Sequence, residues 1–224
     1  MSVEKESFPL LPRKPTVTTD QAVAMATQLF NLRIEDVTSV KELYSYDDRN
    51  FFMRGFLMRG EEEMEVSECK EYILKILNHV DSSHECLTEV QCDVMLFLQS
   101  RGYHCPVPVP STRNTYFVKC KIPRGPKPRS VALETDSVAL ENDNVRFEST
   151  GILGTGIEVY DGKEYSGEKY FVCDVRLLTF VPGKVLKEIP LNNELLFNAG
   201  MAVGRLDRDL QVSANTVGSI ASRC

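Results

Sequence analysis

The stretch EYILKI, Glu71 to Ile76, has the apolar composition of a buried β-strand, yet it places Lys75 where another apolar residue is expected. Burying an ammonium group costs free energy unless an anion lies next to it. We therefore predict a strand from Tyr72 to Leu77 that carries a lysine whose charge meets an anion. The alternative is that the lysine stem lies along the strand and its ammonium group reaches solvent.

The residues before this strand predict its partner. Asn50 to Met58 are mainly aromatic and aliphatic, and Gly60 with three glutamates then marks a turn. We expect an antiparallel pair of strands, with the polar loop from Ser45 to Asn50 leading into the first of them.

Two helices are predicted around this pair. Thr18 and Gln21 have the spacing of a capping box, and the apolar residues that follow recur at helical period, so a helix is expected over Thr19–Asn31. A second helix is expected to be capped by Ser82 or Ser83 and to end at Gly102. Its apolar stripe comprises Leu87, Val90, Val94 and Leu98.

Further elements follow toward the carboxyl end. The segment TYFVKCKI, residues 115–122, predicts a third strand after a Pro-rich connection, and Tyr170–Val181 predicts another that stops at Pro182. A helix capped near Asn192 or Asn193 should come next, before a loose tail at 212–224. The apolar stripe of this helix comprises Leu196, Ala199, Val203, Leu206 and Leu210.

The segment 123–166 differs in character from its surroundings. It opens with the basic, Pro-rich PRGPKPR and continues with the tandem heptads SVALETD and SVALEND, residues 130–143. Such a short repeat cannot bury a core, so we predict a disordered, solvated insertion, with a two-turn amphipathic helix as the alternative. The glycines of GILGTG favour a hairpin turn over a phosphate loop, because no GKS or GKT follows them.

The overall composition excludes several classes of protein. A net charge of −6 over 224 residues argues against nucleic-acid binding, which needs a basic surface. No apolar run approaches the roughly 18 residues of a membrane span, and the polar start lacks a signal peptide, so a cytoplasmic location is expected. Seven scattered cysteines without a CxxC pair predict free thiols rather than a structural zinc site.

Five strings occur in order along the chain: SYDDRNF, EYILKI, TEVQCDVMLFLQSRGY, VRLLTFVPGK and GRLDRDLQ. Together they resemble the aminoglycoside-phosphotransferase-like family of small-molecule kinases, from Thr16 to Gln211. The resemblance implies an α+β fold, a protein-kinase-like small lobe of antiparallel sheet and helices with only the start of a helical large lobe. It implies a flexible amino terminus at 1–15, a nucleotide-binding lobe at 16–182, a hinge with the first large-lobe helix at 183–211, and the tail.

The resemblance also implies roles for individual residues. Lys75 corresponds to the strand lysine that binds nucleotide phosphates. Its orienting carboxylate is expected to be Glu89. Gln91 aligns with the usual glutamate of the family and lies about 200° from Glu89 around a helix, so both cannot face the lysine. Glu85, one turn earlier, is a further candidate.

The remaining candidates for nucleotide binding lie in the loop before the strand pair and at the strand end before Pro182. Ser45 and Asn50 would donate hydrogen bonds to phosphate, whereas the two aspartates between them would repel phosphate and shape the turn or face the metal or the substrate amine. Backbone groups of Thr179, Phe180 and Val181 would pair with the purine. The alternatives are a plain Asx-type turn for the loop and an ordinary strand end for the second group.

The family member that carries similar strings transfers the γ-phosphate of GTP to the hydroxyl of 5-hydroxy-L-lysine and, as for the whole family, Mg²⁺ is expected. ATP as the donor and another amino alcohol, such as choline, as the acceptor stay open. The His-Gly-Asp segment of the family, which supplies the catalytic carboxylate, is not found, so no catalytic residue and no metal ligand is assigned. A truncated, inactive chain that binds nucleotide or a partner covering the last helix is the alternative.

Overall fold

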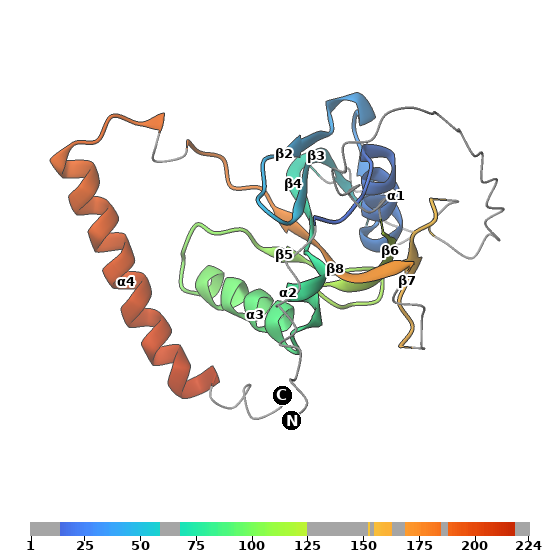
Figure 1. The fold of residues 1–224 in the computed structure, drawn as a ribbon. Coiled ribbons are helices and arrows are strands. Elements are labelled where there is room, and N and C mark those ends of the chain that lie inside the picture. Colours follow the sequence, from blue (N-terminus) through green and yellow to red (C-terminus); the bar gives the residue numbers. More distant parts are fainter. Residues whose placement is uncertain are drawn as a thin grey trace, which may run out of the picture. The chain divides into compact units, whose positions relative to one another are not determined.

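The computed structural model describes residues 14–58, 68–124, 152, 155–162, 169–184 and 188–217. The chain divides into two units, Met1–Phe180 and Val181–Cys224. The first unit contains the sheet with helices α1, α2 and α3, and the second contains α4 (Figure 1).

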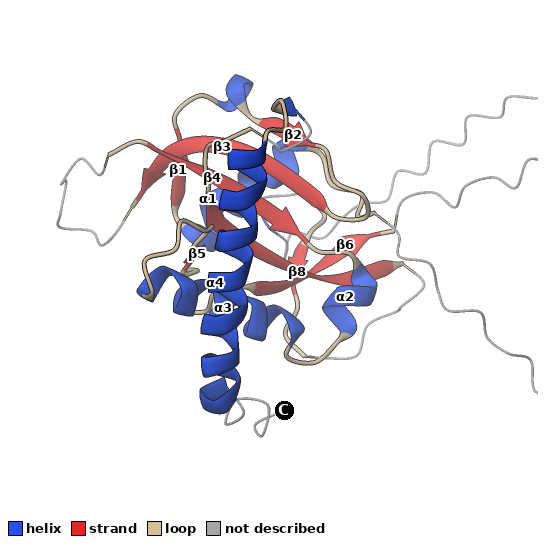
Figure 2. Ribbon diagram, turned by 90° about the vertical axis from the view of Figure 1, so that its left-hand side faces the viewer, coloured by secondary structure: helices blue, strands red, loops and turns tan. Residues whose placement is uncertain are grey.

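The first unit is built on an antiparallel sheet with the strand order β1-β3-β4-β8-β6-β7, in which β2 also pairs with β3 and β5 with β8. The sheet is curved rather than flat (Figure 2). The predicted antiparallel pair is confirmed as β3 and β4, and the two later predicted strands are β6 and β8. The bounds are β1 Leu32–Ile34, β2 Lys41–Leu43, β3 Arg49–Leu57, β4 Lys70–Ile76, β5 Pro108–Val109, β6 Val118–Pro123, β7 Glu158–Val159 and β8 Tyr170–Thr179, with a short 3-10 turn at Val37–Ser39.

Helix α1, Thr19–Phe30, begins at the predicted capping box. The Thr18 side chain accepts from the Gln21 backbone N–H at 3.2 Å, and the Gln21 side chain accepts from the Thr18 N–H at 2.8 Å. The apolar side of α1 joins the core of the unit, together with alternate residues of the strands. Its buried residues are Ala22, Met25, Ala26, Leu29 and Phe30.

The second predicted helix is two helices, α2 at His79–Ser83 and α3 at Leu87–Ser100. The predicted caps Ser82 and Ser83 were wrong, because both lie inside α2 and the cap is Asn78, whose side chain accepts from two backbone N–H groups. The Ser82 hydroxyl instead donates to the Asn78 carbonyl at 2.8 Å. α3 follows Cys86, which has a left-handed backbone with φ of 62° and makes no side-chain cap.

Part of the segment predicted as an insertion belongs to the sheet. β7 pairs with β6, and Ile152 and Ile157 are buried in the core. The Gln21 side chain donates to the Thr155 carbonyl at 2.8 Å and so ties this segment to α1. The heptad repeat at 130–143 lies outside the described residues.

The cysteines of the sheet and its helices are mainly thiols. Cys69, Cys92, Cys105, Cys120 and Cys173 are free, as predicted. The prediction fails at Cys86, whose sulfur is disulfide-bonded. Among the described residues, no group of three or more histidine, cysteine or acidic side chains could hold a metal ion.

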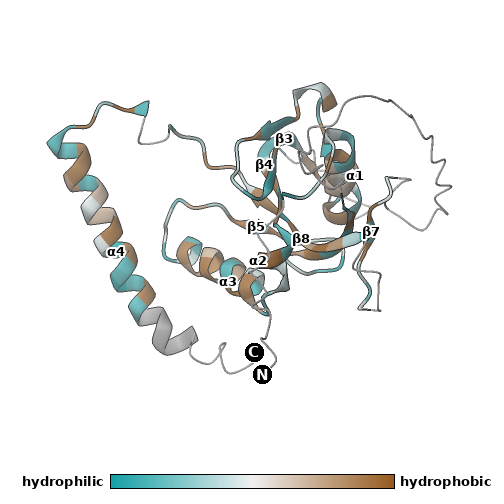
Figure 3. Ribbon diagram, in the orientation of Figure 1, coloured by the Kyte–Doolittle hydropathy of each residue, from teal (hydrophilic) through white to brown (hydrophobic). Residues whose placement is uncertain are grey.

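The second unit consists mainly of α4, Asn193–Val217. Asn192 caps it, as predicted, because its side chain accepts from the Leu195 N–H at 2.7 Å. The helix runs on to Val217, into the segment predicted as a loose tail. Apolar residues recur along it (Figure 3), and Leu196, Phe197, Met201 and Val203 are exposed.

The predicted α+β class is confirmed, and the sheet with its helices is consistent with a kinase-like small lobe. Of the helices that the structure describes, none has both the length and the apolar character needed to cross a membrane.

Candidate functional site

The sheet has two chemically different faces. Along β4, Tyr72, Leu74 and Ile76 are buried in the apolar core, whereas the alternate residues, including Lys75, point to the opposite side. Strand register places Asn50 of β3, Lys75 of β4 and Arg176 of β8 in one cross-strand row. We call this second side the charged face, defined by Asn50, Lys75, Lys119, Asp174 and Arg176.

Lys75 meets a protein carboxylate on this face. Its ammonium group forms an ion pair with Asp48, in the loop that leads into β3, and the two side chains are 23% and 11% exposed. The prediction that an anion meets this lysine is confirmed. The anion is a residue of the loop whose two aspartates we expected only to shape the turn or face metal or substrate.

Asp48 is held by Asn78 as well. Its Oδ1 accepts from the Asn78 backbone N–H at 2.8 Å and from the Asn78 side-chain amide at 3.3 Å. Because Asn78 also caps α2, the loop, the β4 lysine and the start of α2 share one hydrogen-bond network. Such a network limits the positions that the Lys75 ammonium group can take.

A second ion pair lies on the charged face. Lys119 of β6 contacts Asp174 at 2.8 Å and also donates to the Ser82 carbonyl at 3.0 Å. Asp174 is 1% exposed, and its other carboxylate oxygen accepts from the Thr88 hydroxyl at 2.6 Å. Asp174 is thus buried but fully engaged, as the cost of burying a carboxylate requires.

Arg176 is different, because it is buried and incompletely partnered. Its side chain is 5% exposed, and its Nε and Nη1 atoms make no hydrogen bond among the described residues. In the same cross-strand row, Asn50 Oδ1 is also buried without a hydrogen bond there, as is Gln91 Oε1 on α3. The charged face therefore contains a row of polar groups that protein contacts do not fully satisfy.

The predicted site residues fall into two groups. Lys75 and Asn50 lie together on the charged face, with Ser45 in the adjoining loop. Glu89 is exposed on α3. The carboxylate that pairs with Lys75 in the structure belongs to Asp48, and the contact between Glu89 and Lys75 stays a prediction.

The predicted purine-binding residues lie at the end of β8. The backbone N–H of Thr179 donates to the Val107 carbonyl, and the backbone N–H of Phe180 donates to the Glu71 carbonyl, both at 2.9 Å. Since these two N–H groups are used within the fold, Val181 is the remaining predicted donor for a purine.

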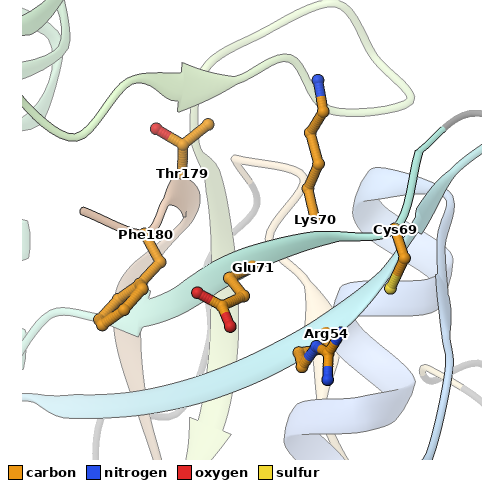
Figure 4. Close-up of a pocket in the computed structure, with 6 residues that line it drawn as sticks. All are labelled: Arg54, Cys69, Lys70, Glu71, Thr179 and Phe180. Atoms are coloured by element: carbon orange, nitrogen blue, oxygen red, sulfur yellow. The ribbon is translucent and has the colours of Figure 1, made fainter. Parts of the chain in front are cut away.

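Thr179 and Phe180 also line a pocket of about 320 Å³ at this end of the sheet (Figure 4). The Phe180 ring packs edge-on against Phe52, with 5.1 Å between ring centroids. The Phe180 ring supplies the aromatic part of the pocket wall, and charged side chains supply other parts of it. The other lining residues are Arg54, Cys69, Lys70 and Glu71.

Sequence reasoning did not identify Arg176 as a site residue. The signal was present, because VRLLTFV places an arginine in an apolar strand, as EYILKI places a lysine. Asp48 was excluded from phosphate contact on charge grounds, but it lies in the loop directly before β3, and the pairing of Asn50 with Lys75 brings that loop near the lysine.

Comparison with known proteins supports the resemblance stated above. The chain is similar to hydroxylysine kinases of Xenopus laevis (29% identical over 210 residues, 94% of this chain), Mus musculus (27% over 198 residues, 88%) and Bos taurus (28% over 198 residues, 88%). It spans about two fifths of the length of these curated relatives, which is 42% of the first and 40% of the other two. No protein-family model matches the chain. No solved structure matches it.

Proposed function

We propose that this chain is the nucleotide-binding part of a small-molecule kinase that transfers the γ-phosphate of GTP to the hydroxyl of 5-hydroxy-L-lysine. The similarity to proteins named hydroxylysine kinase supports the reaction class. The observation that carries the proposal is the half-buried Lys75, oriented by Asp48 on the charged face of an antiparallel sheet.

The ion pair leaves Lys75 able to bind phosphate. An ammonium group has three N–H donors, and the contact with Asp48 uses one of them. The carboxylate therefore orients the lysine and leaves two of its N–H donors for phosphate. A helix glutamate has this orienting role in many kinases. Asp48 has this position in the structure, and Glu89 stays a second candidate for it in a nucleotide-bound state.

Other residues have supporting roles in this proposal. Ser45 and Asn50 would donate to the phosphates, and the backbone of Val181, with Thr179 and Phe180 beside it, would contact the purine. Mg²⁺ would bridge the phosphates and neutralise charge as phosphoryl transfer proceeds. The described residues supply no evident cluster of metal ligands, so the ligands and the base that deprotonates the hydroxyl are assigned to no residue here.

A second candidate function is nucleotide binding without transfer. It is favoured by the site itself, since Lys75 lies where phosphate can bind it, whereas no described residue is assigned as the base or as a metal ligand. In that case the exposed apolar residues of α4 would pack on another protein surface, for example that of a full-length relative.

Calorimetric titration with GTP and Mg²⁺ tests the binding step. We expect the wild-type chain to bind and Lys75→Met to weaken binding at least tenfold. Lys41→Met is the matched control, since Lys41 is an exposed lysine on β2 of the same sheet. Unchanged affinity in Lys75→Met would refute the proposed site.

Incubation with labelled GTP, Mg²⁺ and 5-hydroxylysine tests the transfer step. Label in the amino acid that depends on Lys75 would support the kinase. Binding of GTP without label transfer would support the second candidate.

A further inference from the structure

The charged face carries more positive charge than its carboxylates neutralise. Lys75 pairs with Asp48, and Lys119 pairs with Asp174. Arg176 has no ion pair among the described residues, although its side chain is only 5% exposed. Of the three cations that lie here, the arginine is therefore the one whose charge is left uncompensated.

Its neighbour Cys92 does not supply the missing charge. Cys92 lies on α3 and is 1% exposed. Burial raises the pKa of its thiol, and the adjacent Arg176 only partly opposes that shift. The thiol therefore stays protonated and neutral near pH 7 and leaves the guanidinium charge unbalanced.

An unpaired buried guanidinium is costly. The desolvation penalty of a buried ion is comparable to the net stability of a whole domain. Buried donors in native proteins nearly always have partners, so Nε and Nη1 of Arg176 call for an acceptor that is bound from outside the described chain.

The position of Arg176 indicates which acceptor. It is the direct cross-strand partner of Lys75, and neighbouring strands lie about 4.8 Å apart. A ligand whose oxygens reach Lys75 is therefore within reach of the longer arginine side chain. A guanidinium presents parallel N–H donors that match a phosphate group in a two-point contact.

We propose that Arg176 is a second phosphate-binding cation of this site, which accepts the phosphate groups of the nucleotide bound at Lys75. Lys75 is already neutralised by Asp48, so the charge that attracts the polyphosphate comes mainly from Arg176. The ligand approaches from the Lys75 side, where the lysine side chain is still 23% exposed. This inference rests on the proposed nucleotide-binding function and adds a residue to it.

A variant that removes the charge but keeps the length of the side chain separates a ligand role from a structural one. Arg176→Met should weaken binding of both GTP and inorganic tripolyphosphate at least tenfold by calorimetry. The thermal midpoint without ligand should stay the same or rise, because an uncompensated buried charge is lost. A purely structural arginine would instead make the ligand-free variant less stable.

Arg33→Met is the matched control. Arg33 lies on β1, is exposed and lies over the Phe56 ring at 5.1 Å, so its loss should leave both affinities within twofold of wild type. Arg176→Lys keeps the charge but loses the two-point contact, and it should bind both ligands at an intermediate affinity with near wild-type stability. This second variant keeps the test informative if Arg176→Met does not fold.

The outcomes separate this inference from the proposed function. If Lys75→Met loses GTP while both Arg176 variants bind like wild type, the inference is wrong and the nucleotide site stands. If the wild-type chain binds neither GTP nor tripolyphosphate, both are wrong. A lowered midpoint in Arg176→Met with normal tripolyphosphate binding would also overturn the inference.

Discussion

The apolar face and the charged face of the sheet differ in how their side chains are stabilised. On the side of α1, the strands contribute Phe51, Met53, Leu74 and Leu177, all almost fully buried among apolar neighbours. On the charged face the same strands contribute Asn50, Lys75 and Arg176. The first face gains free energy simply by being covered, whereas the second must satisfy each polar group individually.

The difference separates stability from binding. A ligand has no room to bind the apolar face, because the side chains of that face are closely packed against the rest of the core. The charged face leaves Arg176 and Asn50 with unsatisfied atoms among the described residues, and these are groups that a ligand can contact. Substitutions on the first face should therefore lower stability, and substitutions of the unsatisfied groups on the second should mainly change affinity.

The largest effect on stability is expected at Phe51. It is 1% exposed, and Phe51→Ala should lower the free energy of unfolding by about 3–5 kcal/mol, measured by denaturant titration. Phe52→Ala is the control, because this half-buried neighbour lies on the opposite face and should cost clearly less. Equal losses in the two variants would contradict the assignment of faces.

A smaller loss is expected at Asp48. Asp48→Asn removes the partner of Lys75 and should cost about 3 kcal/mol, the low end for a buried pair, since Lys75 keeps some solvent contact. Asp47→Asn, one residue earlier, should be nearly neutral. A Lys75→Met variant combined with Asp48→Asn should be less destabilised than the sum of the two single variants; additive losses would show that the pair is not coupled.

Alkaline pH should destabilise the apolar face. Burial raises the pKa of Cys120 and of Cys173 to about 12, against 9.0 for a free thiol. Between these values the unfolded chain loses thiol protons that the folded chain keeps, so stability falls as pH rises from about 9 toward 12.

The free energy of unfolding should fall by about 1.4 kcal/mol per pH unit for each thiol in this range. Chemical unfolding at several pH values measures it. A variant with both cysteines changed to alanine should lose most of this slope relative to wild type, although it is less stable at pH 7. An unchanged slope would mean that other groups cause the alkaline loss.

The smallest effect is expected at the start of α1. Thr18→Ala removes one half of the capping box and should cost about 1 kcal/mol in the free energy of unfolding. Thr16→Ala, an exposed threonine before the helix, should cost little. A neutral Thr18→Ala would show that the packing of α1 on the sheet makes its cap unimportant.

Much of the fold was predictable, because it depends on local patterns. The capping box at Thr18 and Gln21 located α1, and apolar strand composition located β3, β4, β6 and β8. The predicted cap was wrong because Asn78, which precedes the serines, caps α2. The break between α2 and α3 was missed because it lies at the left-handed backbone of Cys86, which no sequence pattern marks. The pairing of β7 with β6 joins segments that are far apart in the sequence, so local sequence patterns could not predict it.

The site was predictable only in part. A lysine in an apolar strand signalled an anion, and this was correct. Its identity depended on the register between β3 and β4, which brings the loop with Asp48 to Lys75. Arg176 gained its importance only from its burial and from the pairing of every other cation on the face, which are properties of the folded chain.

An acyl-phosphate derivative of GTP tests the central claim directly, that the charged face binds nucleotide phosphate. A lysine next to the phosphates attacks the acyl carbon, keeps the acyl group as an amide and releases GTP, and peptide mass spectrometry then identifies the labelled lysine. We predict labelling of Lys75 that excess unmodified GTP suppresses. Labelling confined to exposed lysines such as Lys41 and Lys70, or label at Lys75 that GTP does not suppress, would contradict the account.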